Sequence, residues 1–148
     1  MINIGIFGEG VKYIIPIDFD NWDAFERHHY AFKVSETEFD GIFDRVRMTV
    51  APLRYGAGIK GKVIDSLAAG VPCVGTPIAA EGLDLPARLL GLFADSAEEI
   101  AELICRLYRD DEEHEGCAEA GRRFVREAFS APQIDRLMRA VTACNSKA

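Results

Sequence analysis

The sequence has no Cys-x-x-Cys pair and no signal-like N-terminus in which basic residues precede an apolar run. The four cysteines, Cys73, Cys105, Cys117 and Cys144, are widely spaced. This spacing does not fit a zinc motif or a disulfide framework. We therefore expect reduced thiols in a cytoplasmic protein.

Clusters of basic residues and long apolar runs are also missing. The largest group of consecutive Lys or Arg residues is the pair Arg122 and Arg123, and the formal net charge is −7. This charge balance argues against nonspecific nucleic-acid binding. No apolar run approaches the ~20 residues of a membrane-spanning helix. Peripheral membrane contact is expected only through a region outside this sequence.

What is present is the composition of a globular domain. The 148 residues are 49% hydrophobic and 28% charged, and a chain of this length buries enough surface to fold without a metal ion or disulfide. We therefore expect a single domain over residues 1–148. His28 and His29 are neighbours that point to different faces and lack a ligand cluster, so no metal site and no cofactor are predicted.

Short apolar segments alternate with segments of helical periodicity. The predicted strands are residues 2–7, 30–34, 46–51, 72–75 and 90–94, and the predicted helices are residues 22–28, 36–43, 61–69, 97–108, 112–129 and 132–143. This alternation predicts an α/β fold with a Rossmann-like, doubly wound, mainly parallel sheet and helices on both faces.

The two clearest helices have an apolar residue at i, i+3, i+4 and i+7. Ser96 and Glu99 form a capping box at the start of helix 97–108. The apolar positions are Ile100, Leu103, Ile104 and Leu107 in that helix, and Ile134, Leu137, Met138 and Val141 in helix 132–143. We expect both helices to pack on the core. The charged stretch 110–115 is interpreted as a linker and a solvated helix start, not as a metal site.

One glycine-rich segment suggests chemistry. Gly56, Gly58 and Gly61 lie within six residues, after the strand at 46–51 and at the opening of helix 61–69. Glycines let backbone amides form a concave nest, and the first N–H groups of a helix have no partner within it, so a phosphate can accept their hydrogen bonds. Lys60 and Lys62 add positive charge there.

The helix that follows this segment has an expected apolar stripe and an expected ligand side. Lys62 and Asp65, three positions apart, share the side opposite the stripe and could meet a ligand together. A wet surface turn with an ordinary Lys62–Asp65 ion pair is the structural alternative. The expected stripe consists of Val63, Ile64, Leu67 and Ala68.

Two nucleotide motifs match this segment incompletely. Gly56-x-Gly58-x-x-Gly61 has the spacing of the dinucleotide-binding fingerprint, and Glu81 lies where a ribose-binding acid could follow. That fingerprint belongs in the tight turn after a first strand, whereas these glycines follow a later strand, at 46–51, with residues 52–55 in between. The segment also resembles a P-loop, but Val63 replaces the Ser or Thr that would hold Mg²⁺.

The longer string APLRYGAGIKGKVIDSLAAGVPCVGTPIAAEGLDL, residues 51–85, closely resembles the donor-binding half of group 1 glycosyltransferases. The resemblance implies a partial GT-B fold, in which a Rossmann-like C-terminal domain binds a nucleotide-diphosphate sugar and a separate N-terminal domain binds the acceptor. It also favours sugar transfer with retention of configuration.

Site residues follow from the resemblance by position. Asp65 takes the place of the acid that binds the ribose hydroxyls, and Tyr55 and Glu81 are candidates to line the pocket. The donor diphosphate and sugar would be held by Gly56, Gly58, Ile59, Lys60, Gly61 and Lys62.

The sequence departs from the family pattern in several ways, one of which is that it lacks a match for the Arg/Lys pair that grips the diphosphate after the family's first strand. Asp65 is one methylene shorter than the usual Glu, and Ala57 replaces the first acid of the Glu-x7-Glu motif. The acceptor domain is also missing, so the chain resembles a truncated transferase that is inactive alone. Its expected partners are the nucleotide-sugar donor and a missing acceptor-binding domain or partner chain. The alternative is a non-catalytic binding or assembly module with a degenerate glycosyltransferase fold.

Two further features complete the sequence-based expectations. Cys73 lies within a predicted strand between Pro72 and Val74 and is interpreted as a small buried hydrophobic residue. Aromatic residues near the N-terminus would favour a homo-oligomer if they are exposed. These residues are Phe19, Trp22, Phe25 and Phe32.

Overall fold

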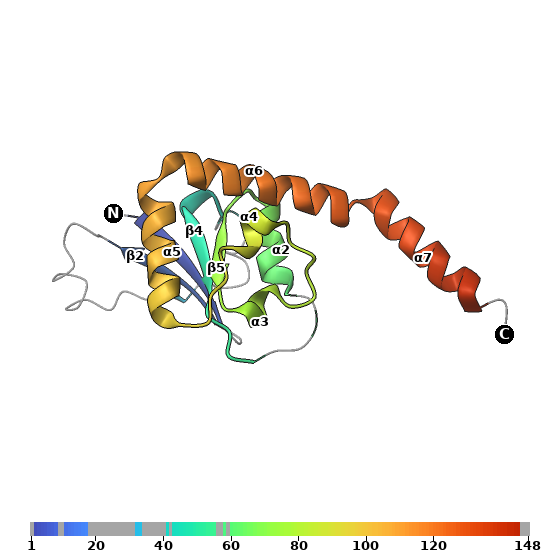
Figure 1. Ribbon diagram of the computed structural model, residues 1–148, viewed down its shortest axis with the longest axis horizontal. Helices are drawn as coiled ribbons and strands as arrows, with labels where there is room; N and C mark the ends of the chain where they lie inside the picture. Colours follow the sequence, from blue (N-terminus) through green and yellow to red (C-terminus); the bar gives the residue numbers. More distant parts are fainter. Residues whose placement is uncertain are drawn as a thin grey trace.

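The computed structural model describes residues 2–8, 11–17, 32–33, 41, 43–55, 58 and 60–145 (Figure 1). The strands are β1 (Ile2–Gly8), β2 (Val11–Ile17), β3 (Phe32–Lys33), β4 (Met48–Ala51) and β5 (Cys73–Gly75). The helices are α2 (Gly61–Ala68), α3 (Pro77–Ala80), α4 (Ala87–Leu90), α5 (Ala97–Arg109), α6 (Asp111–Ala128) and α7 (Ala131–Asn145), with a short 3-10 helix at Phe43–Arg45.

The strands form one mixed sheet in the order β3-β2-β1-β4-β5. The parallel part consists of β1, β4 and β5, with Thr49 opposite Cys73 in the β4–β5 pair. The expected α/β class is therefore confirmed. β2 and β3 extend the sheet in antiparallel orientation. β2 was not predicted, because the apolar stretch 11–17 was not recognised as a strand, whereas β3 lies within the predicted strand 30–34 and confirms it.

The segment at 90–94 was predicted as a strand, and the structure corrects this. Leu90 is the last residue of α4, which begins after the extended Pro86. Phe93 makes only an isolated parallel bridge to Gly75, whose N–H donates to the Leu92 carbonyl at 3.1 Å. The sheet therefore ends at β5 with a single bridged residue beyond it.

The core lies between the parallel strands and helices α2, α4, α5 and α6. Its largest fully buried side chains include Met48, Leu67, Leu89, Leu92 and Leu107. The predicted capping box of α5 is confirmed, because the Ser96 side chain accepts from the Glu99 N–H and Glu99 accepts from the Ser96 N–H. Helix α6 packs directly on α2 at a small residue, Gly121, where an added Cβ would lie 3.1 Å from Leu67.

Helix α7 does not dock on the core, contrary to the prediction from its apolar spacing. It continues beyond α6 and projects away from the body of the molecule (Figure 1). Ile134 and Met138 are 46% and 59% exposed. The chain changes direction at Phe129, the residue that ends α6 and packs edge-to-face on Phe124.

The remaining predicted helices either lie within the described residues, where they can be compared with the structure, or outside them. Helix 61–69 is confirmed as α2, helix 112–129 as α6, and helix 132–143 as α7, within one or two residues at most ends. Helix 22–28 lies outside the described residues, as does most of helix 36–43, whose last residue Phe43 opens the 3-10 helix. Among the described residues, no helix is both long and apolar enough to cross a membrane.

Candidate functional site

The carboxyl ends of β4 and β5 lie at the same edge of the sheet, because these strands are parallel. Residues 52–60 connect β4 to α2 at this edge, and α3 begins there after β5 (Figure 1). The Thr76 hydroxyl donates to the Leu53 carbonyl at 2.6 Å. This bond ties the segment after β4 to the start of α3.

Ala51 and Gly75 hold the bases of these two connections together. The Ala51 carbonyl accepts hydrogen bonds from the Leu53 N–H at 2.9 Å and the Thr76 N–H at 3.2 Å. A Cβ added at Gly75 would lie 2.5 Å from that same carbonyl oxygen. Only glycine allows the two strands to approach this closely here.

Two buried hydroxyls fasten α2 to the strands. Thr49 of β4 and Ser66 of α2 are both fully buried, with their side-chain oxygens 2.7 Å apart. The Ser66 hydroxyl donates to the Val71 carbonyl at 2.8 Å. Because a hydroxyl has one proton, Thr49 must be the donor to Ser66. The chain of bonds therefore runs from Thr49 through Ser66 to Val71.

The buried stripe of α2 differs from the predicted one. Val63 and Leu67 are buried as expected, and Ile64 is half-buried, but Ala68 is exposed and Ser66 is buried in its place. Ser66 was missed because a hydroxyl on a helix face normally indicates solvent, and nothing in the sequence pairs it with Thr49. The buried face of α2 is therefore shifted around the helix axis, so that it includes Ser66 and not Ala68.

The amino end of α2 is the centre of the candidate site. Lys60 is its N-cap residue, and no side-chain hydrogen bond caps the helix there. The Lys60 carbonyl accepts from the Val63 and Ile64 N–H groups at 2.9 and 3.3 Å. The first N–H groups of such a helix point outward, where the helix dipole favours an anion.

Basic and glycine residues surround this helix end. Gly58 is exposed and has a φ of +77°, a conformation that favours glycine. The Lys60 ammonium donates to the Gly58 carbonyl at 2.9 Å, so it already lies beside the segment that the sequence predicted to bind phosphate. Half-buried Lys62 and exposed Asp65 follow on the first turns of α2.

The other predicted site residues are distributed around this end. Tyr55, at 66% exposure, lies on the connection from β4. Gly56 and Ile59, together with Ala57, lie outside the described residues. The structure thus brings together Gly58, Lys60 and Gly61 at the helix start, with Lys62 and Asp65 beside them.

Comparison with known protein families gives a match that includes the candidate site. A family model described as glycosyl transferases group 1 matches residues 19–110, which include the glycine-rich segment, α2, β5 and α3. The chain belongs to the group 1 glycosyl transferases. No curated protein and no solved structure gave a significant match.

The position of the glycine-rich segment differs from that of a dinucleotide-binding fingerprint. In a dinucleotide-binding fold, the fingerprint occupies a tight turn between a strand and a helix. Here residues 52–60 separate β4 from α2. This spacing argues against the dinucleotide interpretation.

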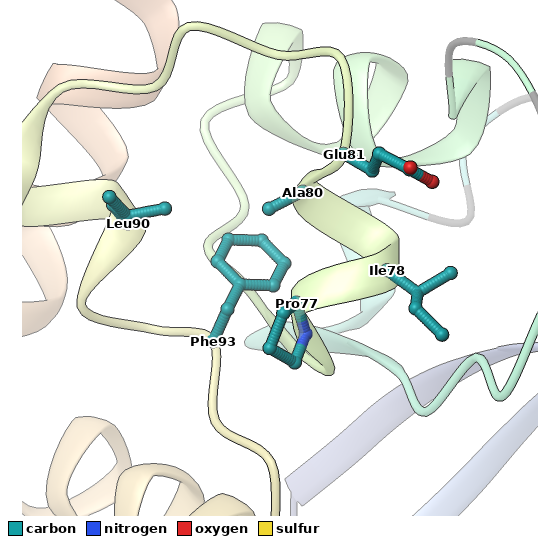
Figure 2. Close-up of a pocket in the computed structure, with 6 residues that line it drawn as sticks. All are labelled: Pro77, Ile78, Ala80, Glu81, Leu90 and Phe93. Carbon is teal, nitrogen blue, oxygen red and sulfur yellow. The ribbon is translucent and has the colours of Figure 1, made fainter.

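Glu81 of this glycosyl transferase is exposed and lies in an apolar groove of about 440 Å³ (Figure 2). Figure 2 shows the Phe93 ring beside Pro77, Leu90 on the other side, and the Glu81 carboxylate directed away from the ring. None of the described residues of the glycine-rich segment lines this groove. The groove is formed by Pro77, Ile78, Ala80, Glu81, Leu90 and Phe93.

Cys73 is confirmed as a small buried residue. Its side chain is 1% exposed in β5, and burial raises the pKa of its thiol to about 11. A thiol of this kind is a poor nucleophile near neutral pH, because the thiolate is the reactive form. Cys73 is therefore part of the core of the glycosyl transferase domain.

The acidic stretch 110–115 is a helix start, as predicted. Asp110 caps α6 by accepting from the Glu113 N–H at 2.8 Å. His114 contacts the Arg47 carbonyl through Nε2 at 2.8 Å. Across the part of the chain that the structure describes, no group of three or more His, Cys, Asp or Glu residues is placed to hold a metal ion.

Proposed function

We propose that this chain is the donor-binding domain of a retaining GT-B glycosyltransferase and that it binds a nucleotide-diphosphate sugar at the amino end of α2. One observation carries the proposal. A helix that lacks a side-chain cap begins at the carboxyl edge of two parallel strands, with Gly58 and Lys60 beside its first turn. Open α/β sheets bind ligands at this edge.

The diphosphate would bind to backbone N–H groups and lysines. Gly56, Gly58, Ile59 and Gly61 would contribute backbone, and Lys60 and Lys62 would contribute charge. The Lys60 ammonium, now on the Gly58 carbonyl, needs only to rotate toward an incoming phosphate oxygen. As the glycosidic bond breaks, the leaving diphosphate gains charge that two ammonium groups can stabilise.

The ribose and the rim of the site are assigned to three further residues. Asp65 is exposed on the second turn of α2, where its carboxylate can accept hydrogen bonds from ribose hydroxyls. Tyr55 is exposed on the connection before the glycines and offers a flat surface to the donor. Glu81 remains a proposed rim residue at the α3 side of the same edge.

Transfer also needs an acceptor site, which we propose is supplied by a separate acceptor-binding domain or partner chain. The residues named above bind and stabilise the donor, and they include no assigned catalytic base or nucleophile. We therefore propose that this domain needs that partner for activity. No metal ion or cofactor has a role in the proposed reaction.

A second candidate function follows from Ala57. This residue stands where the family has the first acid of its Glu-x7-Glu motif, and a methyl group cannot accept a hydrogen bond from the donor sugar. A binding or assembly module that retains the fold without the chemistry would tolerate this change. Hydrolysis or transfer of a sugar nucleotide by the chain with its partner would exclude this candidate.

The test of donor binding is an amide NMR titration with UDP and GDP, with NAD⁺ and ATP as comparison ligands. We expect the largest shift changes at Gly58, Lys60, Lys62 and Asp65. Lys62→Ala should weaken binding by roughly tenfold or more, the value of a charge-assisted hydrogen bond. Arg109→Ala, which removes an exposed cation from the last turn of α5, is the matched control and should leave binding unchanged.

Two outcomes would contradict the proposal. Unchanged spectra at millimolar UDP and GDP would show that the segment does not bind a nucleoside diphosphate. A response to NAD⁺ alone would favour the dinucleotide interpretation instead.

A further inference from the structure

The exposed apolar side chains fall into separate places on the molecule. Among the described residues, the exposed large hydrophobic side chains are those of Tyr55, Leu90, Ile134 and Met138. Tyr55 belongs to the candidate donor site. Leu90 lines the groove beside Phe93, and Ile134 and Met138 lie on α7. One chain therefore presents both an apolar helix face and an apolar groove.

The helix face has the geometry of a docking element. Ile134 and Met138 are four residues apart, so they lie one above the other on the same side of α7. The charged residues Asp135, Arg136 and Arg139 lie on other sides of the helix, and Arg139 pairs with Asp135 at 2.8 Å. Because α7 projects away from its own domain (Figure 1), this face is accessible to another molecule.

The groove has the character of a receiving site. Apolar side chains line most of it, and Leu90 on its wall is 53% exposed. A second depression of about 330 Å³ adjoins it, shares Phe93, and includes the charged residues Glu99, Glu102 and Arg106. Together with Glu81, whose carboxylate is directed away from the Phe93 ring, three acidic residues and one basic residue lie around the apolar centre.

We propose that α7 of one copy docks in the groove of a second copy, in a reciprocal exchange across a two-fold axis. Charge identifies the occupant. Residues 131–148 contain three basic residues and one acidic residue, whereas residues 1–130 contain 14 basic and 23 acidic residues. Contact between the C-terminal segment and the body of another copy joins opposite charges. Contact between two bodies, or between two C-terminal segments, joins like charges.

The reciprocal arrangement also increases the interface area that is buried in the dimer. A stable interface buries about 800 Å² on each partner, which is more than one short helix face provides. Two-fold symmetry creates the same helix-to-groove contact twice. The exchange covers Leu90, Ile134 and Met138 and leaves the amino end of α2 outside the contact. Glu81 is the one proposed donor-site residue that also lines the groove, so the dimer and donor binding are tested separately.

The test is sedimentation equilibrium of the full chain over a range of concentrations. We expect a dimer whose dissociation constant rises at least about tenfold with Ile134→Asp and with Leu90→Asp, as for central interface residues. Both side chains are exposed in the single chain, so neither change should unfold it. Tyr55→Asp, at the remaining exposed site, is the matched control and should leave the dimer intact.

Mixing the two variants distinguishes reciprocal helix-to-groove docking from other ways of forming a dimer. An Ile134→Asp chain has an intact groove, and a Leu90→Asp chain has an intact helix, so their mixture retains one good contact and should associate more tightly than either variant alone. Loss of dimer with Ile134→Asp but not with Leu90→Asp would indicate pairing between two α7 helices and would overturn the proposal. A monomer at every concentration would also overturn it. Nucleotide titration of Leu90→Asp should match that of the unmodified chain.

Discussion

The hydroxyls of Thr49 and Ser66 meet in the core at 2.7 Å and join β4 directly to α2. These two elements lie on either side of the glycine-rich segment. The contact fixes where the helix begins relative to the strand, and so it fixes the frame of the candidate donor site. The direction of the hydrogen bond, from Thr49 to Ser66, has measurable consequences for stability.

Removing the two hydroxyls should have unequal effects. Ser66→Ala leaves both the Thr49 hydroxyl and the Val71 carbonyl without their partner, so we expect a loss of about 1–3 kcal/mol in the free energy of unfolding. Thr49→Val leaves the Ser66–Val71 bond intact and should cost less. Urea unfolding measures both. Ala68→Ser, on the exposed side of α2, should change stability by less than about 0.5 kcal/mol. Equal losses from the two core variants would contradict the assigned bond direction.

Gly75 and Gly61 should respond oppositely to alanine. At Gly75 the new methyl group would press on the Ala51 carbonyl, and overpacking of this kind costs about 1–3 kcal/mol. At Gly61 an added Cβ meets nothing within 4 Å, and the helical backbone there suits alanine, so stability should rise by about 0.4–1 kcal/mol. Thermal unfolding of the two variants makes the comparison. A stable Gly75→Ala protein would show that the strands can separate without cost.

The buried thiol of Cys73 should make stability fall at high pH. Burial raises its folded-state pKa from 9.0 to about 11, so the unfolded chain loses the thiol proton first. The contribution is complete below about pH 9 and is lost as pH rises toward 11. Urea midpoints between pH 8 and 11 should fall less steeply in Cys73→Ala. An identical pH dependence in that variant would exclude the effect.

The α5 capping box should make stability sensitive to acid. Hydrogen bonds from the Ser96 hydroxyl and N–H lower the pKa of the Glu99 carboxyl. The stabilisation is therefore present above the ordinary Glu pKa and is lost as pH falls through the lower folded-state value. Ser96→Ala should cost about 1 kcal/mol at neutral pH and should reduce the dependence on acid. Glu98→Gln, on the same turn without the box contact, is the control for charge alone.

Local signals in the sequence predicted several elements well. The capping box and the i, i+3, i+4, i+7 apolar spacing located α5, because both depend only on residues within one helix. The glycines located the start of α2 for the same reason. Membership in the group 1 glycosyl transferases then agreed with the resemblance carried by residues 51–85.

Features that depend on distant contacts were not predicted. The α7 apolar spacing indicated a buried face but could not indicate where it packs, and in the structure α7 projects away from the body of the molecule (Figure 1). The burial of Ser66 depends on Thr49, which is 17 positions away. The hairpin of β1 and β2 was missed because the strand–helix alternation favoured only parallel strands. In the candidate site, the sequence alone placed Lys60 beside the glycines. Its hydrogen bond to the Gly58 carbonyl and its N-cap position could be seen only in the structure.

The Ala51 carbonyl oxygen receives the N–H groups of both Leu53 and Thr76, so the connection that carries the candidate site and the start of α3 share one anchor point. A ligand that orders the first connection also steadies the second, although it touches only one of them. In the proposed titration, the Thr76 amide should therefore report binding from beneath the site. Amide hydrogen exchange at Thr76 should slow when the donor is bound, which would make this internal bond a built-in gauge of occupancy.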